Sequence, residues 1–365
     1  MSDNTLFTEY NLQGIPLKNR VVMAPMTRSR AVEANTPNEL IAKHYEQRAE
    51  AGLIITEGTS PSPNGLGYPR IPGLFNEAQT AGWKKVTEAV HAAGSKIFVQ
   101  QMHTGRISHV KNLPEGGEVL APSAVKVADA FGQMYVDGEG MLPLTPARAM
   151  TTEEVESAIQ EYIDSAKAAV KAGFDGVEIH GANGYLVNQF INPKSNQRTD
   201  AYGGSVEGRA RFVVKIAEGM AAAIGKEKVA LRISPYGVFN DMGAFEGIDE
   251  QYGYIASEMN RIGIAYIHLA DMSAMTKVPV PDSIKELIRD TFKGTLILNG
   301  AYDKSRANED LNKGKGDLVA FGVPWIANPD LVTRMKEGIA LTQPDQNTFY
   351  TPGAEGYTDY KRADV

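Results

Sequence analysis

The sequence predicts an α/β fold in which parallel strands close into a (β/α)8 (TIM) barrel. Eight short apolar runs alternate with longer amphipathic runs along the chain. This alternation favours a parallel barrel over a doubly wound open sheet, which remains the alternative because periodicity separates the two folds poorly. The 365 residues exceed the ~250 of a typical barrel, which leaves room for loops over one mouth within a single domain spanning 1–365.

The eight predicted strands are short runs rich in Val, Ile and Leu. They cover residues 20–25, 53–59, 95–100, 176–180, 229–234, 265–270, 295–300 and 317–321. Runs with helical periodicity follow them at 37–51, 77–93, 152–172, 206–224, 249–262, 281–292, 304–312 and 329–338. Thr151 and Glu154 match a capping box, and Gly173 stands where a glycine would end the same helix.

Two regions interrupt this alternation. Residues 5–18, with Gln13-Gly14 between short apolar stretches, predict an N-terminal hairpin that closes the barrel bottom before the first strand. Residues 104–150 form a long excursion after the third strand, rich in Gly and Pro. Long loops without a core of their own usually carry function or mobility, so this excursion is expected to cap the active-site mouth, with a plain surface insertion as the alternative.

Composition excludes several classes of protein. Hydrophobic residues make up 42% and charged residues 22%, so a sizeable core can form. The net charge of −7 argues against a nucleic-acid partner, and no run approaches the ~18 apolar residues of a membrane span. Without cysteine the chain has no disulfide or thiolate metal site. Because the first ten residues also lack a leader pattern, a cytoplasmic protein is expected, as a monomer or homodimer.

The end of the fourth predicted strand and the turn after it carry polar groups suited to catalysis. If residues 177 and 179 face the helices, Glu178 and His180 point into the barrel. His180 and Asn183 can aim two donors at one substrate oxygen, and Tyr185 is protonated at pH 7 because free phenols titrate near ~10. A satisfied buried histidine beside a helix-entry turn is the equally compatible structural interpretation.

Five separated segments extend this observation over nearly the entire chain. They are residues 19–30, 100 with 103–109, 176–209, 231–235 and 353–360, which include Asn19-Arg-Val-Val-Met-Ala-Pro-Met-Thr27 and His103-Thr-Gly-Arg106. Together they resemble the Old Yellow Enzyme family, including its N-ethylmaleimide and xenobiotic reductase-like members. The resemblance implies a (β/α)8 barrel that holds FMN and reduces activated C=C bonds with electrons from NADPH or NADH.

The resemblance also implies a mechanism and a substrate class. Hydride passes from the nicotinamide to the flavin and then, in a ping-pong cycle, to the β-carbon of an α,β-unsaturated carbonyl compound such as an enone or a maleimide, or to a nitro compound. His180 and Asn183 then bind the carbonyl oxygen and Tyr185 protonates the α-carbon. The related dienoyl-CoA reductase type needs an iron–sulfur cluster held by cysteines, and this chain has none.

The flavin site can be argued from strand parity. Gln100 and Arg232 both fall on inward positions, and an amide and a cation suit the pyrimidine edge of a flavin. Either residue alone would more often belong to a buried polar network; by resemblance both are flavin ligands. Thr27 matches the family's hydroxyl at flavin O4, and the ring is lined by Pro25, Met26 and Gly58.

The phosphate end departs from the family pattern. Barrels commonly bind phosphate after strands 7 and 8, which here places Asn299, Gly300, Phe321 and Gly322 at the FMN phosphate. Family members usually carry an arginine directly after the second glycine, whereas this chain has Val323. A cation from elsewhere, with Lys304 or Arg306 as candidates, could compensate.

Substrate selection is expected to involve three further residues, Tyr68, Met102 and Tyr350. Met102 stands where many family members have an aromatic side chain, and the two tyrosines match aromatic positions of the family's substrate pocket. The remaining histidines show no metal-ligand spacing and are expected to be surface or scaffold residues; they are His44, His91, His103, His109 and His268.

Two other classes of protein are compatible with the sequence. A metal-dependent hydrolase on the same barrel would need several His and Asp or Glu side chains at strand ends, and only His180 is well placed. A flavin-holding redox sensor with incidental catalysis is the second.

Overall fold

Eight parallel strands close into a barrel in the computed structural model, which describes residues 4–363. Around the barrel they are β10 (Gly176–Gly181), β11 (Val229–Ile233), β12 (Tyr266–Ala270), β13 (Thr295–Asn299), β14 (Leu318–Phe321), β3 (Val21–Met23), β4 (Leu53–Ile55) and β5 (Lys96–Gln101). Each strand overlaps a predicted one, so the barrel is confirmed over the doubly wound sheet. The predicted domain also includes residues 1–3 and 364–365, which lie outside the described residues.

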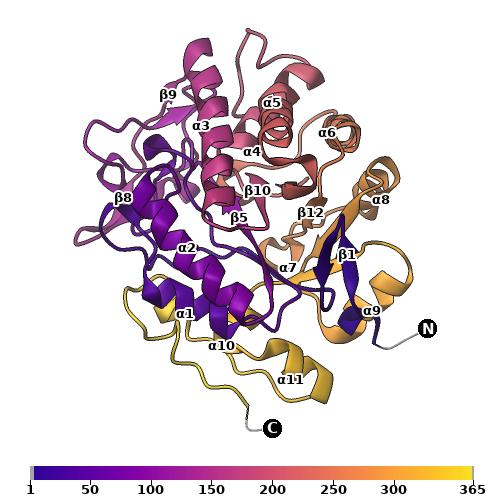
Figure 1. Cartoon of the computed structure of the whole chain (residues 1–365). Coiled ribbons are helices and arrows are strands. Elements are labelled where there is room, and N and C mark those ends of the chain that lie inside the picture. Colours follow the sequence, from indigo (N-terminus) through magenta and orange to yellow (C-terminus); the bar gives the residue numbers. More distant parts are fainter. Residues whose placement is uncertain (1–3, 364–365) are drawn as a thin grey trace.

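The helices surround these strands (Figure 1). Those that match the predicted runs are α1 (Glu39–Gln47), α2 (Glu77–Ala92), α3 (Thr152–Lys171), α5 (Val206–Ile224), α6 (Ile248–Ile262), α8 (Asp282–Thr291), α9 (Lys304–Asn312) and α11 (Leu331–Glu337). Helix α3 begins with the predicted capping box between Thr151 and Glu154. Gly173 follows it with φ +90°, a conformation that glycine adopts readily.

Three short helices were not predicted. They are α4 (Leu186–Ile191), α7 (Ser273–Thr276) and α10 (Pro324–Ala327), and they follow β10, β12 and β14. Each is six residues or fewer, too short for helical periodicity to emerge from the sequence. They nevertheless decide how the chain leaves the carboxyl ends of three barrel strands.

Side chains of the barrel strands alternate between two apolar layers. Val177, Ile179 and Leu231 belong to the large cluster packed against the helices, whereas Phe98 and Tyr266 belong to a smaller cluster inside the barrel. Strands β1 (Tyr10–Leu12) and β2 (Ile15–Leu17) form the predicted antiparallel hairpin. Its Leu12 and Leu17 join the inner cluster, and burying a leucine contributes ~1.5–3 kcal/mol. The hairpin therefore closes the barrel bottom as expected.

The excursion after β5 folds into small pieces of sheet. Strands β7 (Gln133–Val136) and β8 (Gly140–Pro143) form an antiparallel hairpin, and β6 (Leu120–Ala121) pairs with β9 (Arg148–Ala149). Met134 is buried in a cluster with Ile107, against which Tyr68 and Tyr185 pack. The hairpin thus lies over residues of the predicted active site, which favours the capping interpretation over a plain surface insertion.

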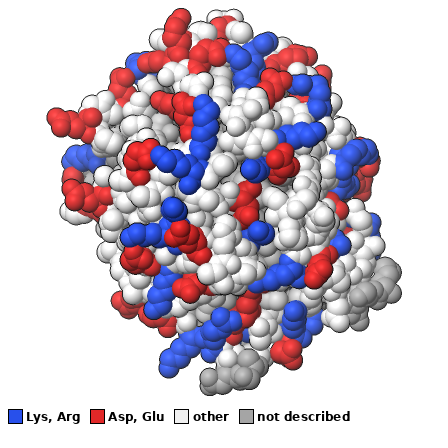
Figure 2. All heavy atoms as spheres, viewed as in Figure 1, with Lys and Arg blue, Asp and Glu red and all other residues white. Residues whose placement is uncertain are grey.

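The surface carries charges of both signs. Figure 2 shows Lys and Arg side chains interspersed with Asp and Glu over the face in view. Within residues 4–363, no helix combines the length and the apolar character needed to cross a membrane.

Candidate active site

A cavity of about 1000 Å³ opens at the carboxyl ends of the barrel strands. This is the end at which TIM barrels place their active sites, because the loops after the strands converge there. The cavity is lined by eleven of the residues singled out from the sequence, which are Pro25, Thr27, Gly58, Tyr68, Gln100, Met102, His180, Asn183, Tyr185, Arg232 and Tyr350. The cavity lining does not include Met26, Asn299, Gly300, Phe321 or Gly322.

A buried polar network underlies the cavity floor. Gln100 Nε2 donates to Glu178 Oε1 at 2.7 Å, and His268 Nδ1 lies 2.9 Å from Glu178 Oε2. Arg232 Nη2 donates to Asn299 Oδ1 at 3.0 Å. These contacts confirm that the three predicted inward positions on β5, β10 and β11 point into the barrel.

The sequence analysis did not predict the part that two residues, Glu178 and His268, play in this network. Glu178 was placed inward without a partner, and His268 was expected only to be scaffold. His268 is fully buried and lies beside Arg232 in the strand register. Strand parity alone could have placed both His268 and Arg232 on inward positions. The contact between Glu178 and His268 could be predicted only with the knowledge that β10 and β12 flank β11.

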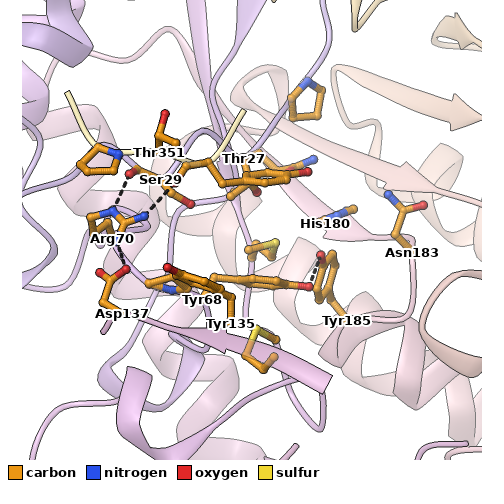
Figure 3. Close-up of a pocket in the computed structure, with 18 of the residues that line it drawn as sticks. Thr27, Ser29, Tyr68, Arg70, Tyr135, Asp137, His180, Asn183, Tyr185 and Thr351 are labelled. Carbon is orange, nitrogen blue, oxygen red and sulfur yellow. Dashed lines mark hydrogen bonds and ion pairs between the residues drawn. The ribbon is translucent and has the colours of Figure 1, made fainter. Parts of the chain in front are cut away.

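Three buried polar atoms at the cavity have no partner within the described chain. They are Nδ1 of His180, Oδ1 of Asn183 and Nε of Arg232. Leaving a buried polar group unpaired costs ~1–3 kcal/mol, so such groups at a cavity indicate that a ligand completes their hydrogen bonds. His180 and Asn183 lie at the same end of the cavity in Figure 3. The unpaired Asn183 atom is the acceptor Oδ1, so this side chain can donate to a ligand oxygen only through Nδ2.

The turn that carries Asn183 is held by its neighbours. Asn183 has φ +57°, in the left-handed region that asparagine tolerates better than most residues. Its N–H donates to Ser234 Oγ at 2.9 Å, and its carbonyl accepts from Asn240 Nδ2 at 2.8 Å. Ser234 directly follows β11, and Asn240 lies in the 3-10 turn Phe239–Asp241. The loop after β11 therefore holds the backbone of the turn at Asn183 in place.

Tyr185 lies at the start of helix α4, opposite a second tyrosine. Its hydroxyl oxygen is 3.0 Å from that of Tyr68, and the two rings are edge-on at 6.2 Å between centroids. The ring of His180 lies 5.1 Å from that of Tyr185. The carbonyl of His103 accepts a hydrogen bond from Leu186 N at 2.9 Å, which ties the helix start to the end of β5.

Burial sets the protonation states of these groups. Burial, followed by the nearby charges of Arg232 and His268, lowers the pKa of His180 well below 6.5, so its imidazole is neutral at pH 7. Burial raises the pKa of Tyr185 above 10, although hydrogen bonds from Tyr68 and Asn240 oppose the shift. The site therefore combines a neutral histidine with a protonated phenol.

Met102 and Tyr350, both predicted to line the substrate pocket, lie at different depths in the cavity. Met102 is buried against Gly58, where an added Cβ would lie 2.6 Å from its sulfur. Tyr350 is 61% exposed and lies at the cavity rim. The C-terminal segment that carries it is held by Arg28 and Arg30, whose guanidinium groups donate to Gly356 O and Thr348 O at 2.7 Å. Tyr350 is therefore a residue of the mouth, whereas Met102 belongs to the interior.

Several lining residues had no signal in the sequence. They include Ser29, Arg70, Tyr135, Asp137 and Thr351. Tyr135 and Asp137 belong to the excursion, for which a capping role was expected without naming residues. Ser29 lies within the segment 19–30 that resembles the family, although no role was assigned to it, and Arg70 lies in the loop after β4, where nothing in the local sequence distinguishes it from ordinary loop residues.

The predicted phosphate end has an arginine beside it. Arg306 Nη1 donates to Gly300 O at 2.6 Å, whereas Lys304 contacts the Phe7 ring and Lys336 O. Val323 is 48% exposed. Of the two candidate cations, Arg306 is the one whose guanidinium lies beside Gly300, the glycine that follows β13.

The donor set fits a flavin better than a metal ion. Gln100 supplies both an acceptor and donors, Arg232 supplies a positive charge, and Thr27 supplies a hydroxyl, all on one cavity. The described residues 4–363 contain no group of three or more His, Cys, Asp or Glu that could hold a metal. An aromatic ring with polar edges matches these partners.

Comparison with known proteins agrees with this geometry. A probable flavin mononucleotide-dependent alkene reductase of Leishmania infantum is 40% identical, over 95% of this chain and 94% of its own. Morphinone reductase superposes with a TM-score of 0.95 at 43% identity, over 100% of this chain and 97% of the other. An Old Yellow Enzyme homologue from Zymomonas mobilis gives 0.92 at 38% identity, over 98% and 99%.

The solved structures also include morphinone reductase in complex with tetrahydroNAD, at 43% identity over 98% of each chain and a TM-score of 0.92. The sequence model of the NADH:flavin oxidoreductase / NADH oxidase family matches residues 5–342. The resemblance to Old Yellow Enzyme is thereby confirmed, and the protein is an FMN-dependent oxidoreductase that belongs to the NADH:flavin oxidoreductase / NADH oxidase family.

Proposed function

We propose that this enzyme reduces the activated C=C bond of α,β-unsaturated carbonyl compounds, with NADPH or NADH as electron donor. The observation that carries the proposal is that the neutral His180, whose buried Nδ1 has no protein partner, lines one cavity with the side chain of Asn183 and the protonated Tyr185. When bound, FMN supplies the hydride, which it has received from the nicotinamide. The protein residues then bind, orient and protonate the substrate.

The cofactor site is proposed from residues at the carboxyl ends of the barrel strands, most of which line the cavity. Gln100 and Arg232 would hold the pyrimidine edge of FMN, and Thr27 would bond its O4. Gly58, Pro25 and Met26 would lie against the ring. At the phosphate, the backbone amides of Gly300 and Gly322 would donate, with the charge of Arg306 nearby.

His180 and Asn183 are proposed to bind the carbonyl oxygen of the substrate. Negative charge develops on this oxygen as hydride reaches the β-carbon, so donors fixed in advance stabilise the transition state more than the ground state. Each such donor is commonly worth ~2.7–4 kcal/mol. The hydrogen bonds from Asn240 and to Ser234 hold the Asn183 turn in place before substrate arrives.

Tyr185 is proposed to protonate the α-carbon. Its raised pKa keeps the proton on the phenol at neutral pH, and the carbanion formed by hydride addition is basic enough to take it. Tyr68 lies within hydrogen-bond distance of the Tyr185 oxygen, so it can donate to that oxygen as the proton leaves. Tyr68 is thus proposed to assist Tyr185 in addition to lining the substrate pocket with Met102 and Tyr350.

The relatives support the two substrates of this proposal. Alkene and enoate reductases are among them, and the tetrahydroNAD complex shows that morphinone reductase accommodates a nicotinamide ligand. Maleimides and nitro compounds are included as candidate acceptors. The choice between NADPH and NADH, the cytoplasmic location and the monomeric or homodimeric state stay predictions.

The test begins with the purified protein. A yellow protein with a flavin absorption band is expected, and a colourless one that needs added Zn²⁺ would instead indicate a metal-dependent hydrolase. The flavin is then reduced anaerobically with NADPH or NADH and mixed with a panel of enones. Reoxidation by enones at rates far above that by saturated ketones supports the proposal, and equal rates with both would contradict it.

A further inference from the structure

Arg70 occupies an unusual backbone position at the mouth of the cavity. Its φ is +54°, in the left-handed region that favours glycine. A side chain with a Cβ is strained there, and strained residues persist where the surrounding structure or a function holds them. The guanidinium of Arg70 lines the cavity, so the strain coincides with a charged group that a ligand can reach.

Three chain segments meet at this guanidinium. Nε donates to Ser29 O at 3.0 Å and Nη2 donates to Tyr350 O at 2.7 Å, which fixes the guanidinium plane against the backbone. Nη1 forms an ion pair with the carboxylate of Asp137 on the β7–β8 hairpin. Figure 3 shows this group at the end of the cavity opposite His180 and Asn183.

The partner of Nη1 is the most readily displaced of the three. The side chain of Asp137 is 48% exposed, compared with 20% for Arg70, and ion pairs with such exposed groups contribute little to stability. Asp137 also lies at the hairpin turn, next to Gly138 with φ +78°. Its carboxylate occupies a site to which another anionic oxygen group could bind in its place.

The charges along the cavity favour such an exchange. Among the described residues that line it, the side chains of Lys, Arg, Asp and Glu type are Arg70, Asp137 and Arg232. Arg232 lies deep at the proposed flavin, so displacing Asp137 leaves an unpaired cation at the mouth. A guanidinium held flat by two backbone carbonyls suits the planar geometry of a carboxylate and the oxygens of a phosphate.

We propose that Arg70 is a specificity-determining residue that binds an anionic oxygen group at the outer end of a ligand whose reacting end lies at His180 and Asn183. The inference rests on the proposed function for the position of the reacting end. Two sources supply this chemistry: a carboxylate on the substrate and the diphosphate of the nicotinamide coenzyme. Asp137 competes with both for Nη1.

The experiment compares matched ligands on matched variants. The substrate probes are enones with carboxyalkyl chains of increasing length, each paired with its methyl ester, and dissociation constants are measured by calorimetry on the FMN-loaded protein. The coenzyme probe is NADH, measured by saturation of anaerobic flavin reduction. The variants are Arg70→Gly, which suits the positive φ, and Asp137→Asn. Glu139→Gln is the control, because it breaks the ion pair of the same hairpin with Lys111 without touching Arg70.

Arg70→Gly is expected to weaken binding of one acid relative to its ester, or of NADH, by about fivefold. Asp137→Asn should strengthen the same ligand, and Glu139→Gln should leave its relative affinity unchanged. The affected ligand identifies the source of the anionic group. The ester reports any general loosening of the mouth, since it lacks the charge.

Two results would overturn the role of Arg70. If Arg70→Gly leaves both the acid-to-ester ratio and the NADH constant at wild-type values while the esters still bind, only this inference is wrong. If Glu139→Gln reproduces the effects of Asp137→Asn, hairpin mobility and not the freed cation is responsible. Failure of every enone to bind the wild-type protein would instead refute the proposed function together with the inference.

Discussion

The hydroxyl oxygens of Tyr68 and Tyr185 lie 3.0 Å apart although the residues are 117 positions apart in the chain. Tyr68 comes from the loop after β4, and Tyr185 begins helix α4 after β10. Burial raises the pKa of both phenols, so both are protonated at neutral pH and one donates to the other. A proton lost from Tyr185 would leave an oxygen that Tyr68 can stabilise. If Tyr185 is the acid as proposed, Tyr68 acts through it, and the first two predictions follow from this relationship.

Replacing Tyr185→Phe should leave flavin reduction by NADPH or NADH nearly intact while slowing reoxidation by simple enones about 10²- to 10⁴-fold. Only the proton donor is lost, so nitro substrates, which need no carbon protonation for the initial hydride transfer, should suffer less. Stopped-flow measurement of each half-reaction checks this. Equal losses in both half-reactions would refute the role of Tyr185 as the acid.

Replacing Tyr68→Phe should slow the same enone step by a smaller factor, about 2- to 10-fold, since one neutral hydrogen bond contributes ~0.5–1.5 kcal/mol. The ring and its edge-on contact with Tyr185 remain, so enone affinity should change less than the rate. The double variant with Tyr185→Phe should be no slower than Tyr185→Phe alone. Independent, multiplying losses would show that Tyr68 does not act through Tyr185.

Phenolic inhibitors should report on His180 and Asn183. A phenolate resembles the enolate that the site is proposed to stabilise, and it should accept hydrogen bonds from both side chains. Loss of one such bond to a charged acceptor, ~1.5–3 kcal/mol, weakens binding about 10- to 100-fold. His180→Ala and Asn183→Gly are suitable variants, because glycine tolerates the φ of +57° at position 183. Titration of the flavin spectrum with phenols gives the affinities, and unchanged values would disprove the assignment.

The pH dependence of the enone step follows from the two pKa shifts. The pKa of His180 is lowered well below 6.5, so its imidazole is protonated only at acidic pH and is neutral at pH 7 and above. The pKa of Tyr185 is raised above 10, so its phenol keeps its proton below that value. Neither group changes its charge at a pH between these two pKa values. The rate of flavin reoxidation by enones should therefore be constant from about pH 7 to 9. An inflection in that window that disappears in Tyr185→Phe would show that the phenol titrates there.

The missing family arginine at Val323 should make FMN retention depend on another cation. A charge-assisted hydrogen bond of ~1.5–3 kcal/mol corresponds to about 10- to 100-fold in affinity. Val323→Arg is expected to slow FMN loss on dilution, and Arg306→Gln to accelerate it, because Arg306 is the candidate that contacts Gly300. Recovery of flavin fluorescence at matched salt measures the loss. Identical constants in wild type and Val323→Arg would show that the phosphate site is already complete, and an unaffected Arg306→Gln would exclude Arg306.

The local sequence pattern was sufficient to predict those features of the structure that depend only on neighbouring residues. The period-two alternation of Gly176–Gly181 placed Glu178 and His180 inside the barrel, and the capping box at Thr151 marked the start of α3. Helix α4 escaped detection because its six residues are uniformly buried and show no amphipathic face. The phosphate-end residues were predicted from the ends of the last two barrel strands and stay predictions; the structure adds that the side chain of Asn299 accepts a hydrogen bond from Arg232.

The sequence by itself determined the eight strands, their inward parity and the grouping of His180, Asn183 and Tyr185, because residues within one strand and turn share a backbone that fixes their directions. Only the tertiary structure decided the pairs Tyr68 with Tyr185 and Arg70 with Asp137, which are 117 and 67 positions apart. Contacts of this kind depend on which strands become neighbours when the barrel closes and on the paths of long loops. Neither is encoded in local periodicity, because each loop conformation is selected by packing against segments distant in the chain.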